Sequence, residues 1–177
     1  MRLPLTIAAA ALLAVPASAE LAPGARAPDF ATRGAMAGKV VDLRLSEQLK
    51  RGPVVLYFFP AAFTSGCNAE AKAFADAVPQ FRAAGATVIG MSADAVPQLQ
   101  KFSTEHCAGK FTVASASPAV LKGYEVELKR PSGATISNRT SYVIDRGGRI
   151  AFAHSDMSPV DHVRTTLAAV QALKRTR

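Results

Sequence analysis

A compact apolar run, Pro53–Phe59 (PVVLYFF), constrains the fold of this chain more than any other segment. The run is rich in β-branched and aromatic residues and is followed by a proline, which is typical of a strand buried on both faces of a sheet. Phe74, Val78 and Phe81 then recur at helical spacing, which predicts a helix over Asn68–Arg82. A buried strand followed directly by a helix is the first half of a βαβ unit.

The remaining pattern continues this alternation. The predicted elements after the first helix are, in order, a strand over Thr87–Met91, a helix over Val96–His106 with caps in Ser92–Asp94, a strand over Phe111–Ala114, a short helix over Pro118–Tyr124, a polar loop over Lys129–Asn138, strands over Ser141–Ile144 and Arg149–Ala153 joined by Asp145–Gly148, and a closing helix over Pro159–Leu173. A further hairpin or strand that includes Gly38–Leu43 is expected before the apolar run.

This order indicates an α/β fold. Alternating strands and helices predict a parallel sheet with helices on its faces, and the late hairpin adds antiparallel edges. A thioredoxin-like three-layer sandwich with a mixed central sheet fits the order, and 177 residues are enough for one such domain with a real core.

The first 19 residues are excluded from that domain. A short positive start, the apolar run Leu3–Val15 and the small residues Ala17–Ala19 form a secretory signal, since the run is too short to span a bilayer. We therefore expect a signal peptide over residues 1–19 and a mature domain over 20–177, located in the periplasm or outside the cell and not in a membrane.

Composition excludes several other functions. The formal charge of +8 is scattered apart from a basic C-terminus, so a nucleic-acid partner is not expected. The chain has two cysteines, Cys67 and Cys107, which allows one disulfide in an exported protein. His106, His154 and His162 show no ligand spacing around Cys67, so neither a metal site nor a cofactor is expected.

Cys67 is the candidate nucleophile. It falls between the first buried strand and the following helix, where free N–H groups and the helix dipole favour an anion and hence the reactive thiolate. A buried structural cysteine is the alternative. Thiolate population alone gives only a modest net gain in rate, because a stabilised thiolate is also a weaker nucleophile. Most of the catalysis must then come from donors aimed at the transition state.

The surrounding residues resemble a known family. Pro60, Thr64 and Cys67 stand in the pattern Pro-x-x-x-Thr-x-x-Cys, which is similar to the active-site loop of the peroxiredoxins, and Arg139–Asp145 resembles the arginine-bearing strand of that family. The residues that point to the bacterioferritin comigratory, or Q-type, subclass are Gly66, Cys67, Glu70 and Phe74. The resemblance covers nearly all of residues 20–177.

This resemblance implies a thiol-dependent peroxidase that reduces hydrogen peroxide and organic hydroperoxides in antioxidant defence. Cys67 would attack the peroxide and become a sulfenic acid, Thr64 would place its hydroxyl beside the sulfur, and Arg139 would stabilise the thiolate and the developing charge. Pro60 would close the pocket wall. Taken alone, Arg139 reads as a surface arginine and Thr64 as a helix cap.

Cys107 is the candidate resolving cysteine. Some Q-type members carry a resolving cysteine in the helix predicted here over Val96–His106, and others carry it five residues after the nucleophile, where this chain has Lys72. A disulfide with Cys67 requires local unfolding, because Cys107 lies near the far end of its helix. The alternative is a single-cysteine enzyme. The reductant is expected to be a thioredoxin-like or other thiol, and the protein a monomer without an exchanged C-terminal arm.

Rival functions stay open from sequence alone. An exported disulfide oxidoreductase needs Cys-x-x-Cys, but Thr64 occupies the first position, and the chain has no tryptophan for a glutathione peroxidase. A thioredoxin-like copper carrier usually has Cys-x-x-x-Cys, whereas Ala71 follows Cys67 at that spacing. A structural exported domain stapled by a Cys67–Cys107 bridge is a further alternative. Neither the preferred peroxide nor the physiological reductant follows from the sequence.

Overall fold

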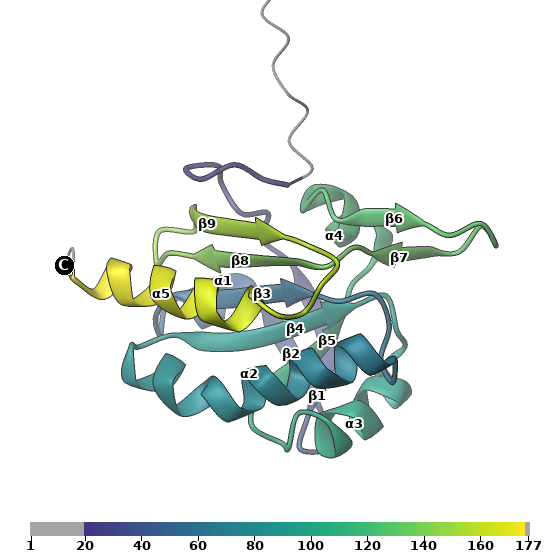
Figure 1. Ribbon diagram of the computed structural model, residues 1–177. Helices are drawn as coiled ribbons and strands as arrows, with labels where there is room; N and C mark the ends of the chain where they lie inside the picture. Colours follow the sequence, from purple (N-terminus) through teal and green to yellow (C-terminus); the bar gives the residue numbers. More distant parts are fainter. Residues whose placement is uncertain (1–19, 176–177) are drawn as a thin grey trace, which may run out of the picture.

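The computed structural model describes residues 20–175 and contains one mixed sheet and a separate hairpin (Figure 1). The strands are β1 (Ala31–Met36), β2 (Lys39–Arg44), β3 (Val54–Phe58), β4 (Thr87–Ser92), β5 (Thr112–Ser115), β6 (Glu127–Lys129), β7 (Thr135–Ser137), β8 (Thr140–Ile144) and β9 (Ile150–Ser155). The helices are α1 (Leu45–Leu49), α2 (Ser65–Ala83), α3 (Val96–Glu105), α4 (Pro118–Gly123) and α5 (His162–Arg175).

The apolar run forms the central strand of the main sheet. The strand order is β2-β1-β5-β4-β3-β8-β9, with β3, β4 and β5 parallel and the outer pairs antiparallel. All five residues of β3 are buried, because the strand has a neighbour on each side and helices over each face. The predicted parallel centre with antiparallel edges is confirmed.

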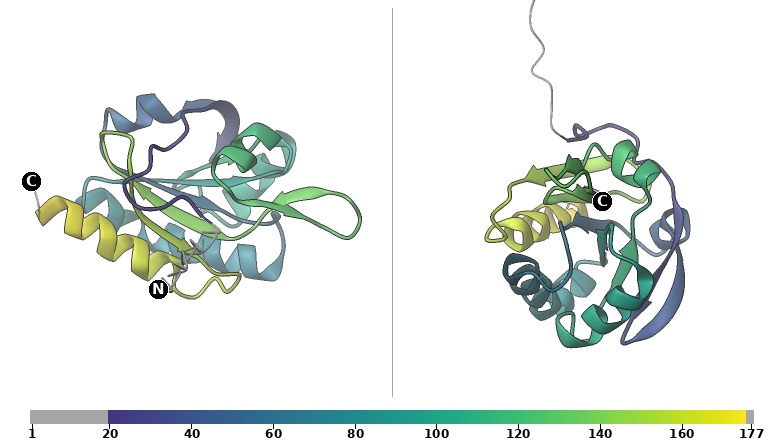
Figure 2. Two further views of the ribbon diagram at one scale, coloured as in Figure 1. Left: turned by 90° about the horizontal axis from the view of Figure 1, so that it is seen from above. Right: turned by 90° about the vertical axis from the view of Figure 1, so that its right-hand side faces the viewer.

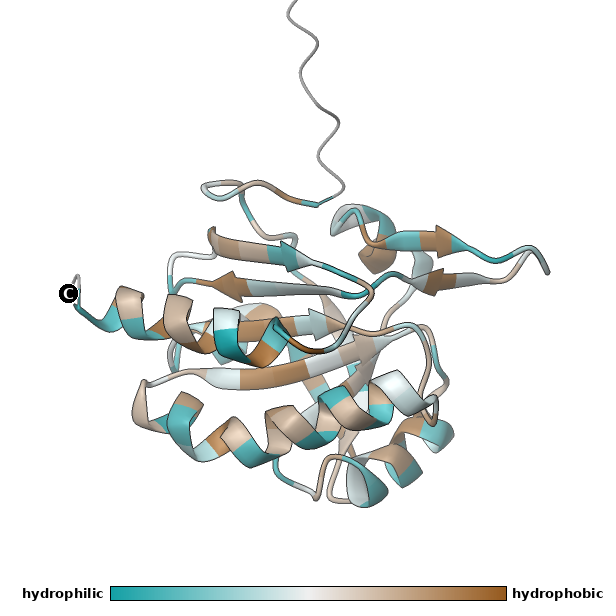
Figure 3. Ribbon diagram, viewed as in Figure 1, coloured by the Kyte–Doolittle hydropathy of each residue, from teal (hydrophilic) through white to brown (hydrophobic). Residues whose placement is uncertain are grey.

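Two helical layers cover the sheet, each with its own core. Val55 and Tyr57 of β3 point into a core under α2, α3 and α5, whereas Val54, Leu56 and Phe58 point into a second core under α1 and α4. The two layers lie on opposite sides of the sheet (Figure 2), and hydrophobic residues line the strands between them (Figure 3). The three-layer thioredoxin-like sandwich predicted from sequence is confirmed.

The polar stretch Lys129–Asn138 departs from its prediction as a loop. β6 and β7 pair antiparallel, with Leu128 opposite Ile136, and project from the body of the protein (Figure 1). Every residue of β6 is exposed and the one buried residue of β7 is the polar Ser137, so these strands leave no alternating apolar pattern in the sequence. The short helix α1 was also missed, because five residues are too few to establish a helical period.

The predicted signal peptide, residues 1–19, lies outside the described residues. Within residues 20–175, no helix combines the length and the apolar character needed to cross a bilayer.

Candidate active site

Cys67 lies in the first turn of α2, after the carboxyl end of β3. Thr64 is the N-cap, and the first main-chain bond of the helix runs from the Asn68 N–H to the Thr64 carbonyl at 2.8 Å. Cys67 is therefore the third helical residue, and the prediction of a helix beginning at Asn68 is wrong by three residues. Ser65 and Gly66 hide the true start because they read as a turn. The N–H groups ahead of Asn68 lack intrahelical partners and favour an anion at this position.

Arg139 reaches the sulfur from the other side of the site. Its Nη2 donates to Cys67 Sγ at 3.5 Å, its Nη1 to Glu70, and its Nε to the Met157 carbonyl at 2.9 Å. Both Cys67 and Arg139 are almost fully buried. Burial opposes the charge on Arg139, but the adjacent Glu70 and Cys67 raise the pKa of the guanidinium above its ordinary value. Arg139 is thus a fixed cation that touches the sulfur.

Glu70 is the second acidic side chain at the Arg139 guanidinium. It lies one helical turn after Cys67, so both side chains share one face of α2 and one guanidinium. Burial raises the pKa of the Glu70 carboxyl to about 7, although Arg139 acts in the opposite direction. Sequence reasoning placed Glu70 in the family resemblance but gave it no role. Its i, i+3 spacing from Cys67 was the available signal.

His162, at the start of α5, lies behind Glu70. Its Nε2 contacts the main-chain carbonyl of Asp156 at 2.9 Å, and its Nδ1 contacts the hydroxyl of Ser141 at 2.8 Å. Burial lowers the pKa of the imidazole to about 4, so the ring is neutral. The Nδ1 atom is 3.8 Å from Glu70 Oε1. No pattern in the sequence brings His162 near Cys67, since their proximity depends on the packing of α5 against α2.

The loop between β3 and α2 is tied to the sheet. Asp94 accepts a hydrogen bond from the Ala62 N–H at 2.6 Å and another from Ser92 Oγ at 2.8 Å. The prediction that Ser92–Asp94 caps α3 is therefore wrong: Ala95 is the N-cap, and the carboxylate of Asp94 is used to hold the active-site loop.

Two further candidates lie on this loop. Pro60 is buried at the end of β3, next to the Phe59 carbonyl that accepts from Ser137 Oγ at 2.7 Å. Thr64 is exposed, and its hydroxyl donates to the Ala61 carbonyl at 3.0 Å. Arg139 is thus in contact with the sulfur, whereas the Thr64 hydroxyl is bonded to the Ala61 carbonyl on the adjoining turn.

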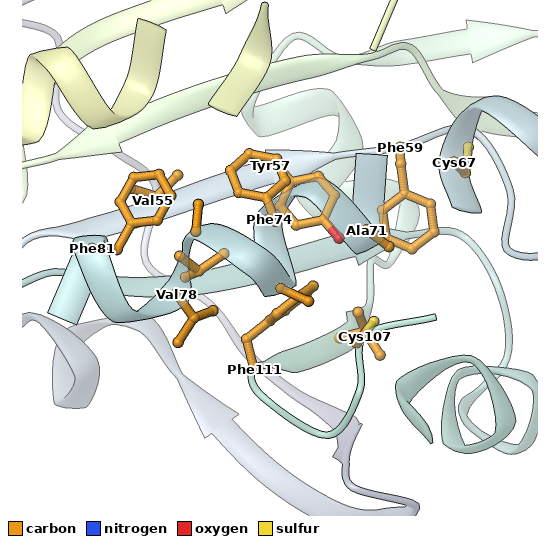
Figure 4. Close-up of a cluster of buried hydrophobic side chains, with 14 of the residues drawn as sticks. Val55, Tyr57, Phe59, Cys67, Ala71, Phe74, Val78, Phe81, Cys107 and Phe111 are labelled. Carbon is orange, nitrogen blue, oxygen red and sulfur yellow. The ribbon is translucent and has the colours of Figure 1, made fainter. Parts of the chain in front are cut away.

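Cys107 follows α3 and is fully buried. Both Cys107 and Cys67 are free thiols. Burial raises the pKa of the Cys107 thiol to about 12, which keeps it protonated. Both cysteines belong to one hydrophobic cluster, and Figure 4 shows them on separate segments with Phe59 and Ala71 between them in that view. Both thiols are thus held in the packing of one core.

Comparisons with known proteins agree with this geometry. Residues 23–153 match the AhpC/TSA family. The chain is 31% identical over 159 residues to the chloroplastic peroxiredoxin Q of Sedum lineare, covering 88% of this chain and 81% of that protein. It is 32% identical over 151 residues to the chloroplastic peroxiredoxin Q of Oryza sativa subsp. japonica, covering 85% of this chain and 67% of that protein.

Solved structures show the same relationship. The crystal structure of the peroxidoxin BcpB from Mycobacterium tuberculosis is similar with a TM-score of 0.77 and 30% identity, covering 85% of this chain and 97% of that chain. These matches do not favour a copper-binding or purely structural domain. The chain belongs to the AhpC/TSA family and is a Q-type peroxiredoxin, a thiol-dependent peroxidase.

Proposed function

We propose that Cys67 is the nucleophile of this peroxidase, with Arg139, Thr64 and Pro60 forming its site. The observation that carries the assignment is the contact of the Arg139 guanidinium with Cys67 Sγ at the start of α2, where both side chains are buried. A cation and free helical N–H groups then meet at one sulfur. Cys107, by contrast, lies in apolar packing.

The step is a displacement at oxygen. The Cys67 thiolate attacks the near oxygen of a hydroperoxide, an S–O bond forms, and the O–O bond breaks with its electron pair on the leaving oxygen. Arg139 and the N–H groups of the first turn stabilise the charge as it moves from sulfur to oxygen. Thr64 lies on the same turn, and a change of its side-chain rotamer directs the hydroxyl from the Ala61 carbonyl to the bound peroxide. Pro60 forms part of the wall of the peroxide pocket and, as a proline, adds no N–H donor there.

Cys107 then resolves the sulfenic acid as an intramolecular disulfide. Its release requires the end of α3 to open, because a thiol with a raised pKa in an apolar core is unreactive. Phe63 of the active-site loop packs edge-on against Phe102 and His106, so the loop of Cys67 touches the segment that holds Cys107. Phe63 also has a φ of +67°, a strained conformation for a bulky residue that opening of the loop would relieve.

The cellular setting is also part of this proposal. The signal pattern over residues 1–19 supports export to the periplasm or the cell exterior, where a thioredoxin-like protein would reduce the disulfide. The large exposed apolar side chains of residues 20–175 lie on four segments, of which only the β9–α5 loop carries two, and this spread supports a monomer because obligate interfaces are more hydrophobic. The exposed apolar residues are Val40, Phe63, Leu128, Met157 and Val160.

Peroxide treatment with mass spectrometry tests these assignments. With one equivalent of hydrogen peroxide and dimedone present, the adduct is expected on Cys67, and the Cys67→Ser variant is expected to consume no peroxide above background. The exported protein should begin at Glu20. A Cys67→Ser variant that consumes peroxide like the parent would refute the assignment of the nucleophile.

The same sample without dimedone tests Cys107. Non-reducing peptide mapping is expected to find a Cys67–Cys107 peptide during turnover with a thiol reductant. Cys107→Ala should leave the first equivalent of peroxide consumed at the parent rate and should let excess peroxide oxidise Cys67 further, since no internal thiol intercepts the sulfenic acid. If the parent yields no such peptide, the enzyme uses a single cysteine.

Gly66→Ala tests the placement of Arg139 without removing any functional group. A Cβ on Gly66 would lie 3.2 Å from Arg139 Nη2, so the guanidinium must shift by a few tenths of an ångström. We expect kcat/KM for peroxide to fall by about three- to ten-fold, since a displacement near 1 Å can cost about a hundred-fold. Thermal stability should be unchanged or higher, because alanine is the better helix former. Equal losses of activity and stability would contradict the prediction.

A further inference from the structure

Glu70 and Cys67 compete for one cation. Both contact the guanidinium of Arg139, and all three side chains are buried. If thiolate and carboxylate were both ionised, the cluster would hold two anions and one cation, with a net negative charge away from water. A buried uncompensated charge is costly, so one of the two acids is expected to keep its proton.

The contacts of Glu70 indicate where that proton lies. Oε2 accepts from Arg139, whereas Oε1 is fully buried and has no hydrogen-bond partner among residues 20–175. His162 Nδ1 lies 3.8 Å from Oε1, beyond hydrogen-bond distance. An ionised oxygen in this position would be left without a donor, which costs far more than a neutral O–H left in the same place.

The tautomer of His162 supports this reading. A main-chain carbonyl only accepts hydrogen bonds, so Nε2 carries the hydrogen that is donated to Asp156. In the neutral ring Nδ1 is then a lone pair, which accepts from the Ser141 hydroxyl. The atom that faces Glu70 Oε1 therefore carries no hydrogen, and it offers no donor to a carboxylate oxygen at that position.

We propose that Glu70 stores a proton beside the Cys67 thiolate and gives it to the leaving oxygen when the peroxide is cleaved. This rests on the proposed role of Cys67. Attack on ROOH gives Cys67–SOH and RO⁻, and the proton of Glu70 converts RO⁻ to ROH and leaves the Glu70 carboxylate. Atoms and charge balance without a proton from solution. Two thiols of the reductant then restore the thiolate, the protonated carboxyl and one water.

The charge of the cluster stays balanced when the proton leaves Glu70 as the thiolate is consumed. The thiolate is consumed in the step, so afterwards Arg139 has only Glu70 to pair with, and the new carboxylate is compensated. Before the step, burial raises the pKa of Glu70 to about 7, which keeps the proton available near neutral pH. Glu70 does not touch the peroxide, so its proton travels through Arg139, which bonds to the carboxyl through Nη1 and to the sulfur through Nη2. The guanidinium gives a hydrogen to the leaving oxygen and takes the hydrogen of Glu70 in its place, so it is a cation again after the step.

Other ionisable groups around Glu70 do not carry this proton. His162 and His154 stack edge-on beyond it, and burial keeps His162 neutral. The Asp156 side chain accepts from the Ser158 N–H and raises the pKa of His162 only weakly against that burial. Tyr57, buried under α2, has a pKa well above its ordinary range and stays protonated.

Counting protons during a single turnover tests the proposal. A pH-indicator dye in weak buffer reports proton uptake after mixing with one equivalent of hydrogen peroxide, and dimedone labelling counts the Cys67 oxidised. The lower pH is chosen where the ultraviolet absorbance shows Cys67 as thiolate in every protein. The parent should take up almost no proton at about pH 6 and about one at about pH 8, on either side of the Glu70 titration.

Glu70→Gln keeps the size of the side chain and its contact with Arg139 but has no acidic proton. It should take up about one proton per Cys67 oxidised at both pH values, whatever its rate. Glu105→Gln, at an exposed position at the end of α3, is the matched control and should behave like the parent. Because uptake is divided by the Cys67 oxidised, a merely misplaced Arg139 would lower the rate without changing this ratio.

Two results would overturn the inference. A parent that takes up a full proton at about pH 6 does not draw it from Glu70. A parent in which the infrared band of a protonated carboxyl persists through Cys67 oxidation keeps the proton where it was, and this measurement needs no variant. If Cys67 forms no sulfenic acid at all, the assignment of the nucleophile falls first, and the dimedone count distinguishes that outcome.

Discussion

Replacing Arg139 with methionine is expected to lower kcat/KM for hydrogen peroxide by about a hundred- to a thousand-fold. Methionine fills much of the same volume but donates nothing to Cys67 Sγ, so both the thiolate and the charge on the leaving oxygen lose their nearest cation. The rate of peroxide consumption with saturating thiol reductant measures the effect. A loss below about five-fold would show that the helical N–H groups alone carry the transition state.

The same substitution separates catalysis from stability. Arg139→Met leaves the Glu70 carboxyl buried without its partner, which is expected to cost about 3–5 kcal/mol of unfolding free energy if the carboxylate stays ionised, and less once it holds a proton. The double variant Glu70→Met/Arg139→Met replaces the whole pair with apolar groups and should recover most of that stability. Its peroxidase activity should remain as low as that of the single variant. Recovered activity in the double variant would exclude Arg139 from the chemistry.

The sequence predicts the centre of this fold better than its periphery. β3 is a continuous apolar run because its residues face both cores, and α2 has a helical period because Phe74, Val78 and Phe81 pack into one of them. In the projecting β6–β7 hairpin the one buried residue is the polar Ser137, so its strands leave no apolar period to detect. Elements that pack on a core need apolar residues at fixed positions, and those positions are recognisable in the sequence.

The candidate site divides along the same line. Cys67 was found from its place between the buried strand and the following helix, and Pro60, Thr64 and Arg139 were found through the family resemblance. His162 could not be found, because it reaches Glu70 only when α5 packs against α2. Its ring lies beside the Glu70 carboxyl although the two residues are far apart in the sequence. Tertiary packing, rather than any local motif, decides the protonation state of this site.

Burial shifts the pKa values of Glu70 and His162 in opposite directions. Their effects on the free energy of unfolding should therefore cancel over a shared range of pH. Burial raises the pKa of Glu70 from 4.5 to about 7, so the folded state keeps a proton that the unfolded state loses, and stability falls as pH rises through this window. Burial lowers the pKa of His162 from 6.5 to about 4, so the unfolded state holds the extra proton, and stability rises with pH. Each slope is about 1.4 kcal/mol per pH unit.

Two variants should therefore uncover opposite slopes that the parent hides between about pH 4.5 and pH 6.5. In Glu70→Gln only the contribution of His162 to the pH dependence remains, so relative to the parent its unfolding free energy should rise by roughly 3 kcal/mol across that range. In His162→Gln only the contribution of Glu70 remains, and the unfolding free energy should fall by a similar amount. Chemical denaturation at a series of pH values measures both, and all other ionisable groups cancel in the differences from the parent. Three parallel curves would mean that neither proton differs between the folded and unfolded chains, and the neutral carboxyl beside the thiolate would lose its thermodynamic basis.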